Sequence, residues 1–202
     1  MSRSPVAAII LAAGASSRMG RPKALLGLPS RGSFAGAIAD AATEAGVAIV
    51  CFVLGPPHGE AIRAALPPSA RVAWNADPSR GMLSSIQAGI AAVQHEAEAA
   101  LVWPVDQPLV SVATVRALLA APADRIVIPV RAGRGGHPVR LPRALFPPVM
   151  ALPHERGLRG LMEDEPARVL RIEVEDRGAV ADVDTPGDYA RIGQNEDRQN
   201  RE

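Results

Sequence analysis

The feature that most constrains the fold is a series of short, continuous apolar runs that alternate with longer segments. Runs of strand length lie at residues 6–11, 47–54 and 100–105. Strands that are apolar at every position are typical of parallel sheets, because both faces of such a sheet are covered. Alanine-rich segments of helix length, at residues 34–45 and 83–98, separate these runs. The alternation predicts an α/β fold with a Rossmann-like, doubly wound, mostly parallel sheet.

The rest of the chain continues this pattern less regularly. Further strands are predicted at residues 71–74, 126–130, 138–141, 169–174 and 179–183, and further helices at residues 59–66, 111–121, 158–163 and 186–192. Neither an internal repeat nor an interdomain linker is recognisable in the sequence. We therefore expect a single domain over residues 1–192, followed by a polar, disordered tail at residues 193–202.

The composition narrows the class of protein. Hydrophobic residues make up 48% of the chain, enough for one sizeable core, and aromatic residues only 3%, so that the core must be aliphatic. The formal net charge of +1 predicts no general attraction to nucleic acid or to a membrane surface. No signal peptide and no apolar run long enough to span a membrane is recognised. A single cysteine, Cys51, excludes an internal disulfide and favours the cytoplasm.

The loop after the first apolar run is the first candidate for a phosphate site. Residues 11–26 read LAAGASSRMGRPKALL, and small residues let backbone N–H groups approach a phosphate chain closely. Arg18, Arg21 and Lys23 add positive charge. Lys23 is the only lysine among 22 lysine and arginine residues, and its ammonium is a compact charge on a flexible stem. The loop matches neither a Walker motif nor a GxGxxG fingerprint, so a tight turn with solvated charges is the alternative.

Carboxylates follow two other segments that are expected to end near this loop. Asp106, in LVWPVDQPLV, stands at the carboxyl end of a predicted strand, which is the edge where open parallel sheets bind ligands. Asp182 and Asp184, in ADVDTPGDY, alternate in an extended stretch, so only one of them can face the site. Carboxylates there can hold Mg²⁺, which also bridges phosphate oxygens. Turn or helix capping by these aspartates is the alternative.

Five motifs occur in a fixed order along the chain. They are LAAGxSxRMGxPKALL, Asp-Gln-Pro after an apolar strand, GMxSSIxAGI, GxGGHPV and DVDTPxD. The set resembles the molybdenum cofactor nucleotidyltransferases, above all their cytidylyltransferase branch, from about residue 6 to residue 192. The resemblance implies the nucleotidyltransferase fold and an enzyme that transfers a nucleoside monophosphate from its triphosphate to a phosphorylated acceptor, releasing pyrophosphate.

The resemblance also implies roles for individual residues. The base and ribose would lie on Leu11, Ala12, Ala13 and Gly14, and the opposite side of the pocket would be formed by Arg80, Gly81, Ser84 and Ser85. The expected catalytic residues are Arg18 and Lys23, which would bind the triphosphate, and Asp106, which with Asp184 would hold Mg²⁺. No general base is expected, because a phosphate nucleophile is already ionised at pH 7.

The identity of the two substrates follows less directly. Guanylyltransferase relatives carry glycine where this chain has Ala13, so a narrower pocket favours CTP, with UTP and ATP as alternatives. The acceptor implied by the resemblance is molybdopterin or the molybdenum cofactor, with a molybdoenzyme or its chaperone as a protein partner. On the acceptor side the resemblance places His137, Arg156 and Arg159, for which packing in a turn and solvated helix charges are the alternatives.

Two departures from the family pattern affect the acceptor side. Val105 stands before Asp106, where the cytidylyltransferases usually have glycine, and the glycine pattern near residues 29–33 is altered. The alternative functions are a sugar- or alditol-phosphate nucleotidyltransferase and a regulator or chaperone that binds nucleotide without turnover.

Overall fold

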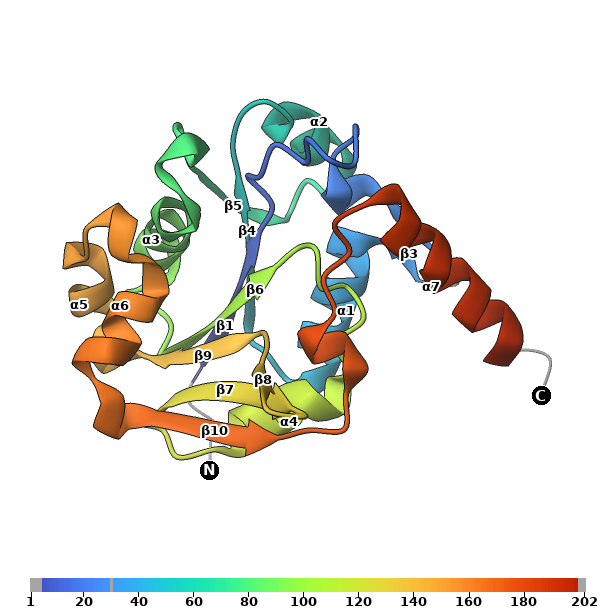
Figure 1. Cartoon of the computed structure of the whole chain (residues 1–202). Coiled ribbons are helices and arrows are strands. Elements are labelled where there is room, and N and C mark those ends of the chain that lie inside the picture. The colour runs from blue at the N-terminus through green and yellow to red at the C-terminus, as the bar shows by residue number, and fades with distance from the viewer. Residues whose placement is uncertain (1–4, 30, 200–202) are drawn as a thin grey trace.

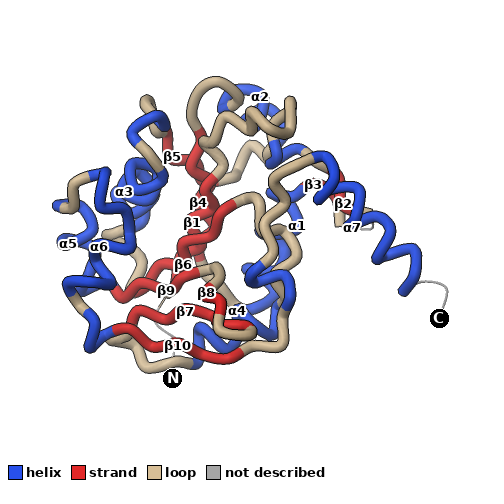
Figure 2. The backbone as a smooth tube through the Cα atoms, in the orientation of Figure 1, coloured by secondary structure: helices blue, strands red, loops and turns tan. Residues whose placement is uncertain are grey.

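The computed structural model describes residues 5–29 and 31–199, with side chains up to Ile192. A central sheet divides the molecule into two layers of helices (Figures 1 and 2). The strands of this sheet are β1 (Val6–Leu11), β4 (Ile49–Leu54), β5 (Arg71–Trp74), β6 (Ala99–Pro104), β7 (Ile126–Arg131), β8 (Arg134–Gly135), β9 (Val139–Pro142) and β10 (Val169–Glu173). Strands β2 (Gly27–Leu28) and β3 (Gly32–Ser33) pair in a separate small ribbon.

The sheet is mostly parallel, as the apolar runs predict. Its strand order is β10-β7-β9-β6-β1-β4-β5, and β8 pairs with β7. Strands β6, β1, β4 and β5 pair in parallel, as do β7 and β10, whereas β9 is antiparallel to both of its neighbours. Strand β1 lies between β4 and β6. The chain therefore first adds β4 and β5 on one side of β1 and later adds β6 on its other side. Such a switch point opens a crevice at the carboxyl ends of the strands.

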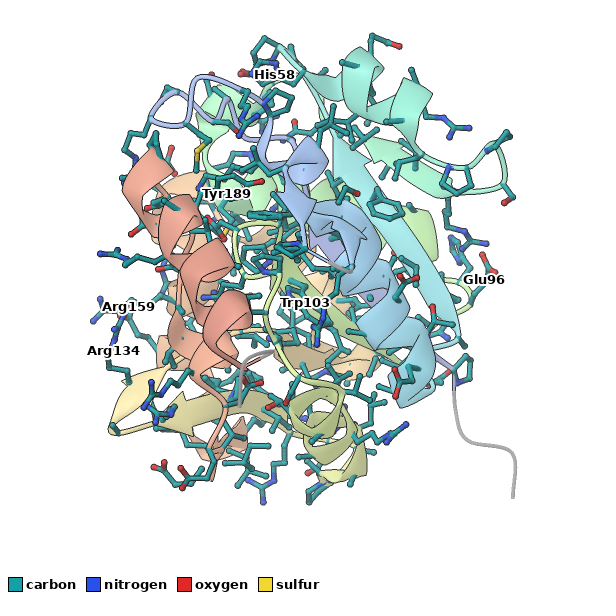
Figure 3. The ribbon with its side chains drawn as sticks, turned by 90° about the vertical axis from the view of Figure 1, so that its right-hand side faces the viewer. His58, Glu96, Trp103, Arg134, Arg159 and Tyr189 are labelled. Carbon is teal, nitrogen blue, oxygen red and sulfur yellow. The ribbon has the colours of Figure 1, made fainter. Side chains whose placement is uncertain are left out.

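Helices cover both faces of the sheet. They are α1 (Phe34–Ala45), α2 (Gly59–Ala65), α3 (Met82–Val93), α4 (Val112–Ala120), α5 (Phe146–Ala151), α6 (Gly157–Asp164) and α7 (Pro186–Gln199). Alternate residues of β1 point to opposite faces. Ala8 and Ile10 pack in the cluster with α1 and α4, and Ala7 and Ile9 in the cluster with α3, α5 and α6. Figure 3 shows Trp103, which is fully buried, in the interior of the molecule.

Short 3₁₀ turns connect these elements. They are η1 (Lys23–Leu25), η2 (Pro78–Arg80), η3 (Arg143–Leu145), η4 (His154–Arg156), η5 (Pro166–Arg168) and η6 (Arg177–Val180). None of the helices in the described part of the chain is long and apolar enough to cross a membrane.

Two predictions near the C-terminus are wrong. Residues 179–183 do not form a strand, because η6 occupies their first part and the Val183 N–H donates to the Asp106 carbonyl across the carboxyl edge of the sheet. Helix α7 continues to Gln199, beyond the end predicted at residue 192, while the disorder expected from residue 193 stays a prediction. The segment is all polar, but glutamine, glutamate and arginine are good helix formers, and no proline follows Pro186. The expected disorder of residues 200–202 lies outside the described residues.

Candidate active site

A cavity of about 290 Å³ lies where the carboxyl ends of β1 and β6 meet. The loop after β1 forms one wall, and the segment before α7 reaches it from the other end of the chain (Figure 1). Of the residues expected from the sequence, the lining includes Leu11, Ala12, Ala13, Gly14, Arg18, Lys23, Gly81, Ser85, Asp106 and Asp184. The fold therefore brings together residues that are up to about 170 positions apart in the sequence.

Lys23 is the centre of this cavity. Its ammonium Nζ lies 2.5 Å from Asp184 Oδ1 and 3.3 Å from Asp106 Oδ2. The Lys23 side chain is only 11% exposed, so its ammonium is largely shielded from water. The backbone N–H of Lys23 donates to Ser16 Oγ at 3.2 Å, which anchors the loop to the start of η1. Arg18 adds a second cation, with its Nη1 2.8 Å from Asp184 Oδ2.

The two carboxylates differ in their electrostatic surroundings. Burial raises the pKa of the Asp106 carboxyl, and the nearby Lys23 ammonium opposes that rise. The hydrogen bond from Lys23 holds the pKa of Asp184 below its usual value, against a smaller effect of burial. Arg18 contributes in the same direction at Asp184. Although the two side chains are about equally exposed, Asp184 is thus the more firmly ionised of the two.

The donor set fits a magnesium-type ion only in part. Asp106 and Asp184 each place an oxygen against the same ammonium, so their carboxylates converge on one cation position. Within residues 5–29 and 31–199, no group of three or more histidine, cysteine, aspartate or glutamate side chains could hold a metal. Mg²⁺ is commonly bound by one or two carboxylates together with substrate phosphates and water. The arrangement therefore fits a metal that arrives with a triphosphate.

Asp182 and Asp184 differ in their position and in their partners. Asp184 lines the cavity, whereas Asp182 Oδ1 accepts a 2.7 Å hydrogen bond from Gln107 Nε2 and does not line it. Gln107 was not expected as a site residue, although it belongs to the Asp-Gln-Pro motif. The Gln107 backbone carbonyl also accepts a hydrogen bond from the Trp103 indole, which ties the turn after β6 to the core.

The wall opposite the loop is built on the start of α3. Gly81, at φ +94°, and Ser85 line the cavity. Ser84 does not, because it faces inward and its hydroxyl donates to the Gly81 carbonyl. The buried Asn75 amide donates to both serine hydroxyls, at 2.8 and 2.9 Å. Asn75 was missed; its signal was a polar side chain directly after a strand.

Arg80 is also outside the cavity lining. Its guanidinium contacts His154 Nε2 instead, across the gap between η2 and η4. Because η2 turns this side chain toward η4, Arg80 belongs to the neighbouring surface in this structure.

The residues expected on the acceptor side line a second cavity. His137, Arg156 and Arg159 border a space of about 570 Å³, which shares Met82 with the first cavity. Burial lowers the pKa of His137, which favours a neutral imidazole. Arg156 pairs with Asp164 at 2.8 Å and Arg159 with Glu163 at 3.2 Å. Both guanidinium groups therefore have carboxylate partners within α6.

Comparison with known proteins agrees with this geometry. The family model for the MobA-like NTP transferase domain matches residues 8–169. Nicotine blue oxidoreductase of Paenarthrobacter nicotinovorans is 37% identical over 193 residues, covering 89% of this chain and 92% of the relative. Molybdenum cofactor cytidylyltransferase of Escherichia coli (strain K12) is 27% identical over 192 residues, covering 92% and 94%.

Solved structures show the same similarity. Rv0371c from Mycobacterium tuberculosis H37Rv superposes with a TM-score of 0.82 at 31% identity, covering 95% of this chain and 98% of that one. A structure of Rv0371c in complex with manganese gives a TM-score of 0.76 at 29% identity, with the same coverage. A divalent metal has thus been observed in a protein of closely similar fold.

Proposed function

The chain belongs to the MobA-like NTP transferase family, and we propose that it transfers CMP from CTP to the phosphate of a small acceptor, releasing pyrophosphate. The first candidate acceptor is molybdopterin or the molybdenum cofactor, in keeping with the name of the relative from Escherichia coli. Nucleotidyl transfer itself is the activity of the family; the nucleotide, the acceptor and the residue roles are our proposal.

The observation that carries this proposal is the position of Lys23 between Asp106 and Asp184. A tightly held ammonium and two carboxylates, at the mouth of a loop of small residues, form a charge arrangement suited to a metal-bound triphosphate. A turn with solvated charges would leave Lys23 exposed. The near-complete burial of Lys23 therefore favours the phosphate-binding interpretation of the loop.

The chain's own residues would act mainly by positioning and charge neutralisation. Lys23 and Arg18 would bind the β- and γ-phosphates and stabilise the negative charge of the departing pyrophosphate. Asp106 and Asp184 would hold Mg²⁺, which supplies charge neutralisation at the phosphates when bound. An oxygen of the acceptor phosphate would form the new bond to the α-phosphorus as the bond to the bridging oxygen breaks. No protein base is required, because that acceptor oxygen is already ionised.

The preference for CTP rests on Ala13. This residue is 2% exposed and lines the cavity beside Leu11 and Ala12. Its methyl group takes up space that a glycine would leave to a larger base. A pyrimidine is therefore the better fit, and UTP is the nearest competitor.

The experiment measures nucleotide binding first and turnover second. Isothermal titration with CTP, UTP, ATP and GTP in the presence of Mg²⁺ should give the highest affinity for CTP. Pyrophosphate release is then followed with molybdopterin and a panel of sugar and alditol phosphates. Asp106→Asn should abolish metal-dependent release, whereas Asp124→Asn, at an exposed surface ion pair with Arg125, should not. Retained turnover in the Asp106 variant would refute the metal assignment.

Other outcomes would select a different function. Release with sugar phosphates alone would identify a sugar-phosphate nucleotidyltransferase, and tight CTP binding without turnover would favour a regulator or a chaperone for a molybdoenzyme. A second candidate, reductase activity, is raised by the name of the 37% identical relative. The sequence contains no GxGxxG fingerprint to support it, and oxidation of a nicotinamide cofactor without pyrophosphate release would be its signature.

A further inference from the structure

An open depression of about 620 Å³ adjoins the nucleotide cavity and contains an unusual group of arginines. Arg131 and Arg134 come from the β7–β8 hairpin, and Arg177 begins η6. Arg18 and Asp184 line both spaces, so the depression opens directly onto the edge of the candidate active site. Figure 3 shows Arg134 at the surface of the molecule. We call Arg131, Arg134 and Arg177 the arginine cluster.

The hairpin places two like charges opposite each other. Arg131 and Arg134 are directly paired in the antiparallel ladder of β7 and β8, so their side chains lie on the same face. The two-residue turn between them has φ +49° at Ala132 and φ +78° at Gly133. Like charges at directly opposed positions are destabilising, and alanine is strained at positive φ. An anion between the two guanidinium groups would relieve the repulsion between these like charges.

A close backbone contact brings Arg177 to the same place. A Cβ atom on Gly136 would lie 1.9 Å from the Ala179 carbonyl oxygen, so only glycine permits this approach. The His137 N–H donates to the same Ala179 carbonyl at 2.9 Å, which fixes the strand after the hairpin against η6. The third cation therefore comes from a rigidly packed neighbouring element.

Within the described part of the chain, the arginines of the cluster have no carboxylate partner, whereas five other arginines of the surface have one. Elsewhere, ion pairs join Arg71 to Glu96, Arg116 to Glu44, Arg125 to Asp124, Arg143 to Glu98 and Arg168 to Glu165. Among the residues with described side chains, no carboxylate lies within 4.0 Å of a nitrogen of the cluster. One donor is occupied, since Arg131 Nε donates to the Glu175 carbonyl at 3.3 Å.

The carboxylates that share the depression are committed to other groups. Asp182 accepts from the Gln107 amide and Asp184 from Lys23. Asp188 accepts from the backbone N–H and hydroxyl of Thr185 at 2.8 and 2.7 Å. These carboxylates keep their negative charge, but within the described structure none of them pairs directly with an arginine of the cluster, whose guanidinium groups therefore keep donors free for an anion.

We propose that the arginine cluster is a second phosphate-binding site, separate from the triphosphate-binding site proposed at Lys23 and Arg18. Guanidinium groups bind phosphate oxygens with charge-assisted, often bidentate hydrogen bonds. This inference deepens the proposed function, on which it rests, because the phosphate would come from the acceptor or from the departing pyrophosphate. The arginine cluster would supply the cations that bind the acceptor. Arg156 and Arg159, which we expected in that role, form ion pairs with carboxylates of α6 instead.

The test titrates inorganic phosphate into protein whose nucleotide cavity is already filled. The α,β-methylene analogue of CTP with Mg²⁺ occupies that cavity, and calorimetry follows phosphate binding to the wild type, Arg134→Gln and Arg177→Gln. Arg168→Gln is the matched control. Arg168 forms an ion pair with Glu165 at 3.1 Å and does not belong to the cluster. We expect one saturable phosphate site whose affinity falls about tenfold or more in either cluster variant and is unchanged in the control.

A stability measurement separates binding from a structural role. Arg134→Gln removes one of two opposed charges, so its midpoint of thermal unfolding should be unchanged or higher, whereas loss of a structural arginine would lower it. Inorganic phosphate should raise the midpoint of the wild type more than that of the variant. Absence of saturable binding of phosphate or pyrophosphate to the wild type both with and without the analogue, or equal affinity in the cluster variants, would overturn the proposal.

Two further arms identify the source of the phosphate and keep the two proposals apart. If a phosphomonoester binds to protein that already holds the CTP analogue, the site belongs to the acceptor. If pyrophosphate binds only in the absence of the analogue, and this binding is lost in Arg134→Gln, the site belongs to the leaving group. Both results support the site. If the analogue fails to bind, the proposed function fails, and phosphate is titrated alone. Binding lost in Arg134→Gln but kept in Lys23→Met then still supports the arginine cluster, and the converse overturns it.

Discussion

At the scale of single residues, Lys23 stabilises the folded protein even without a bound substrate. Its ammonium separates two carboxylates that would otherwise face each other in a partly buried cavity. Lys23→Met should therefore lower the free energy of unfolding by about 2 kcal/mol, the typical worth of a hydrogen bond to a charged group. Mg²⁺ should restore part of this loss, because it supplies positive charge at the same place. Urea unfolding with and without Mg²⁺ measures both effects.

The same variant should also bind CTP more weakly, by tenfold or more, as titration calorimetry would record. Stability that is insensitive to the substitution and to Mg²⁺ would show that the lysine does not balance Asp106 and Asp184. Unchanged CTP affinity would remove Lys23 from the triphosphate site.

A second residue-scale prediction concerns the base of the nucleotide. Ala13→Gly should improve turnover with GTP relative to CTP, because removing a buried methyl group widens the cavity beside the base. The measurement is the ratio of kcat/KM for the two nucleotides in wild type and variant. A change of about tenfold corresponds to 1.4 kcal/mol, which is within the range for one methyl-sized contact. An unaltered ratio would move base selection to another part of the pocket.

At the scale of elements, the start of α7 controls the position of Asp184. Thr185 and Asp188 form a reciprocal cap, in which the Asp188 carboxylate accepts from the backbone N–H groups of Asp184 and Thr185. The hydrogen bonds from Thr185 lower the pKa of Asp188 to about 2 from a usual value of 3.8. The folded state thus favours the ionised form, so the stabilisation is complete above about pH 4 and is lost as the pH falls toward 2.

Comparison with Asp188→Asn isolates this effect from other titrating groups. The wild type should be more stable than the variant at pH 7, and the difference should disappear between about pH 4 and pH 2. Urea unfolding at a series of pH values provides the measurement. A difference that stays constant down to pH 2 would mean that the charge of Asp188 does not stabilise the cap.

The contact between the β8 hairpin and η6 depends on one glycine. Gly136→Ala should destabilise the protein by about 1–3 kcal/mol, the usual cost of forcing an atom into a packed site, because its Cβ would lie 1.9 Å from the Ala179 oxygen. Gly135→Ala is the control one position earlier, where the nearest atom is at an ordinary 3.5 Å. Thermal unfolding that is equally affected in the two variants would contradict the close approach.

The same elements show what could be predicted from the sequence. Continuous apolar runs and their spacing predicted the strands and the mostly parallel sheet, because burial on both faces leaves a pattern in the sequence. They also predicted a site after β1 and β6, because strand ends share one edge of the sheet. The segment at residues 179–183 was misassigned, since apolar residues there pack on neighbouring elements without joining a ladder. The roles of Gln107 and Arg177 depend on contacts between distant segments, which no local pattern records, whereas Asn75 was missed although it directly follows a strand.

At the scale of the whole molecule, the candidate site joins the two ends of one chain across a single sheet. The loop after β1 supplies Lys23, and the segment before α7 supplies Asp184, while the Tyr189 hydroxyl donates to the Gly27 carbonyl at 2.7 Å. The guanidinium of Arg21 also lies 5.4 Å from the centre of the Tyr189 ring. Local opening at either end would therefore disturb the site, and binding at the site should stabilise both ends.

This arrangement predicts a single unfolding transition that responds as a whole to nucleotide. A ligand at one hundred times its dissociation constant stabilises a protein by about 2.7 kcal/mol, which for a chain of this size raises the midpoint by roughly 5–10 °C. Calorimetric scans with and without CTP and Mg²⁺ should show one peak that moves by that amount and does not split. The peak should not move with CTP in Asp106→Asn if the metal is needed for binding. Two transitions, of which only one shifted with nucleotide, would contradict the prediction that residues 1–192 form one domain, because the segments that build the site would then unfold independently of the remaining sheet.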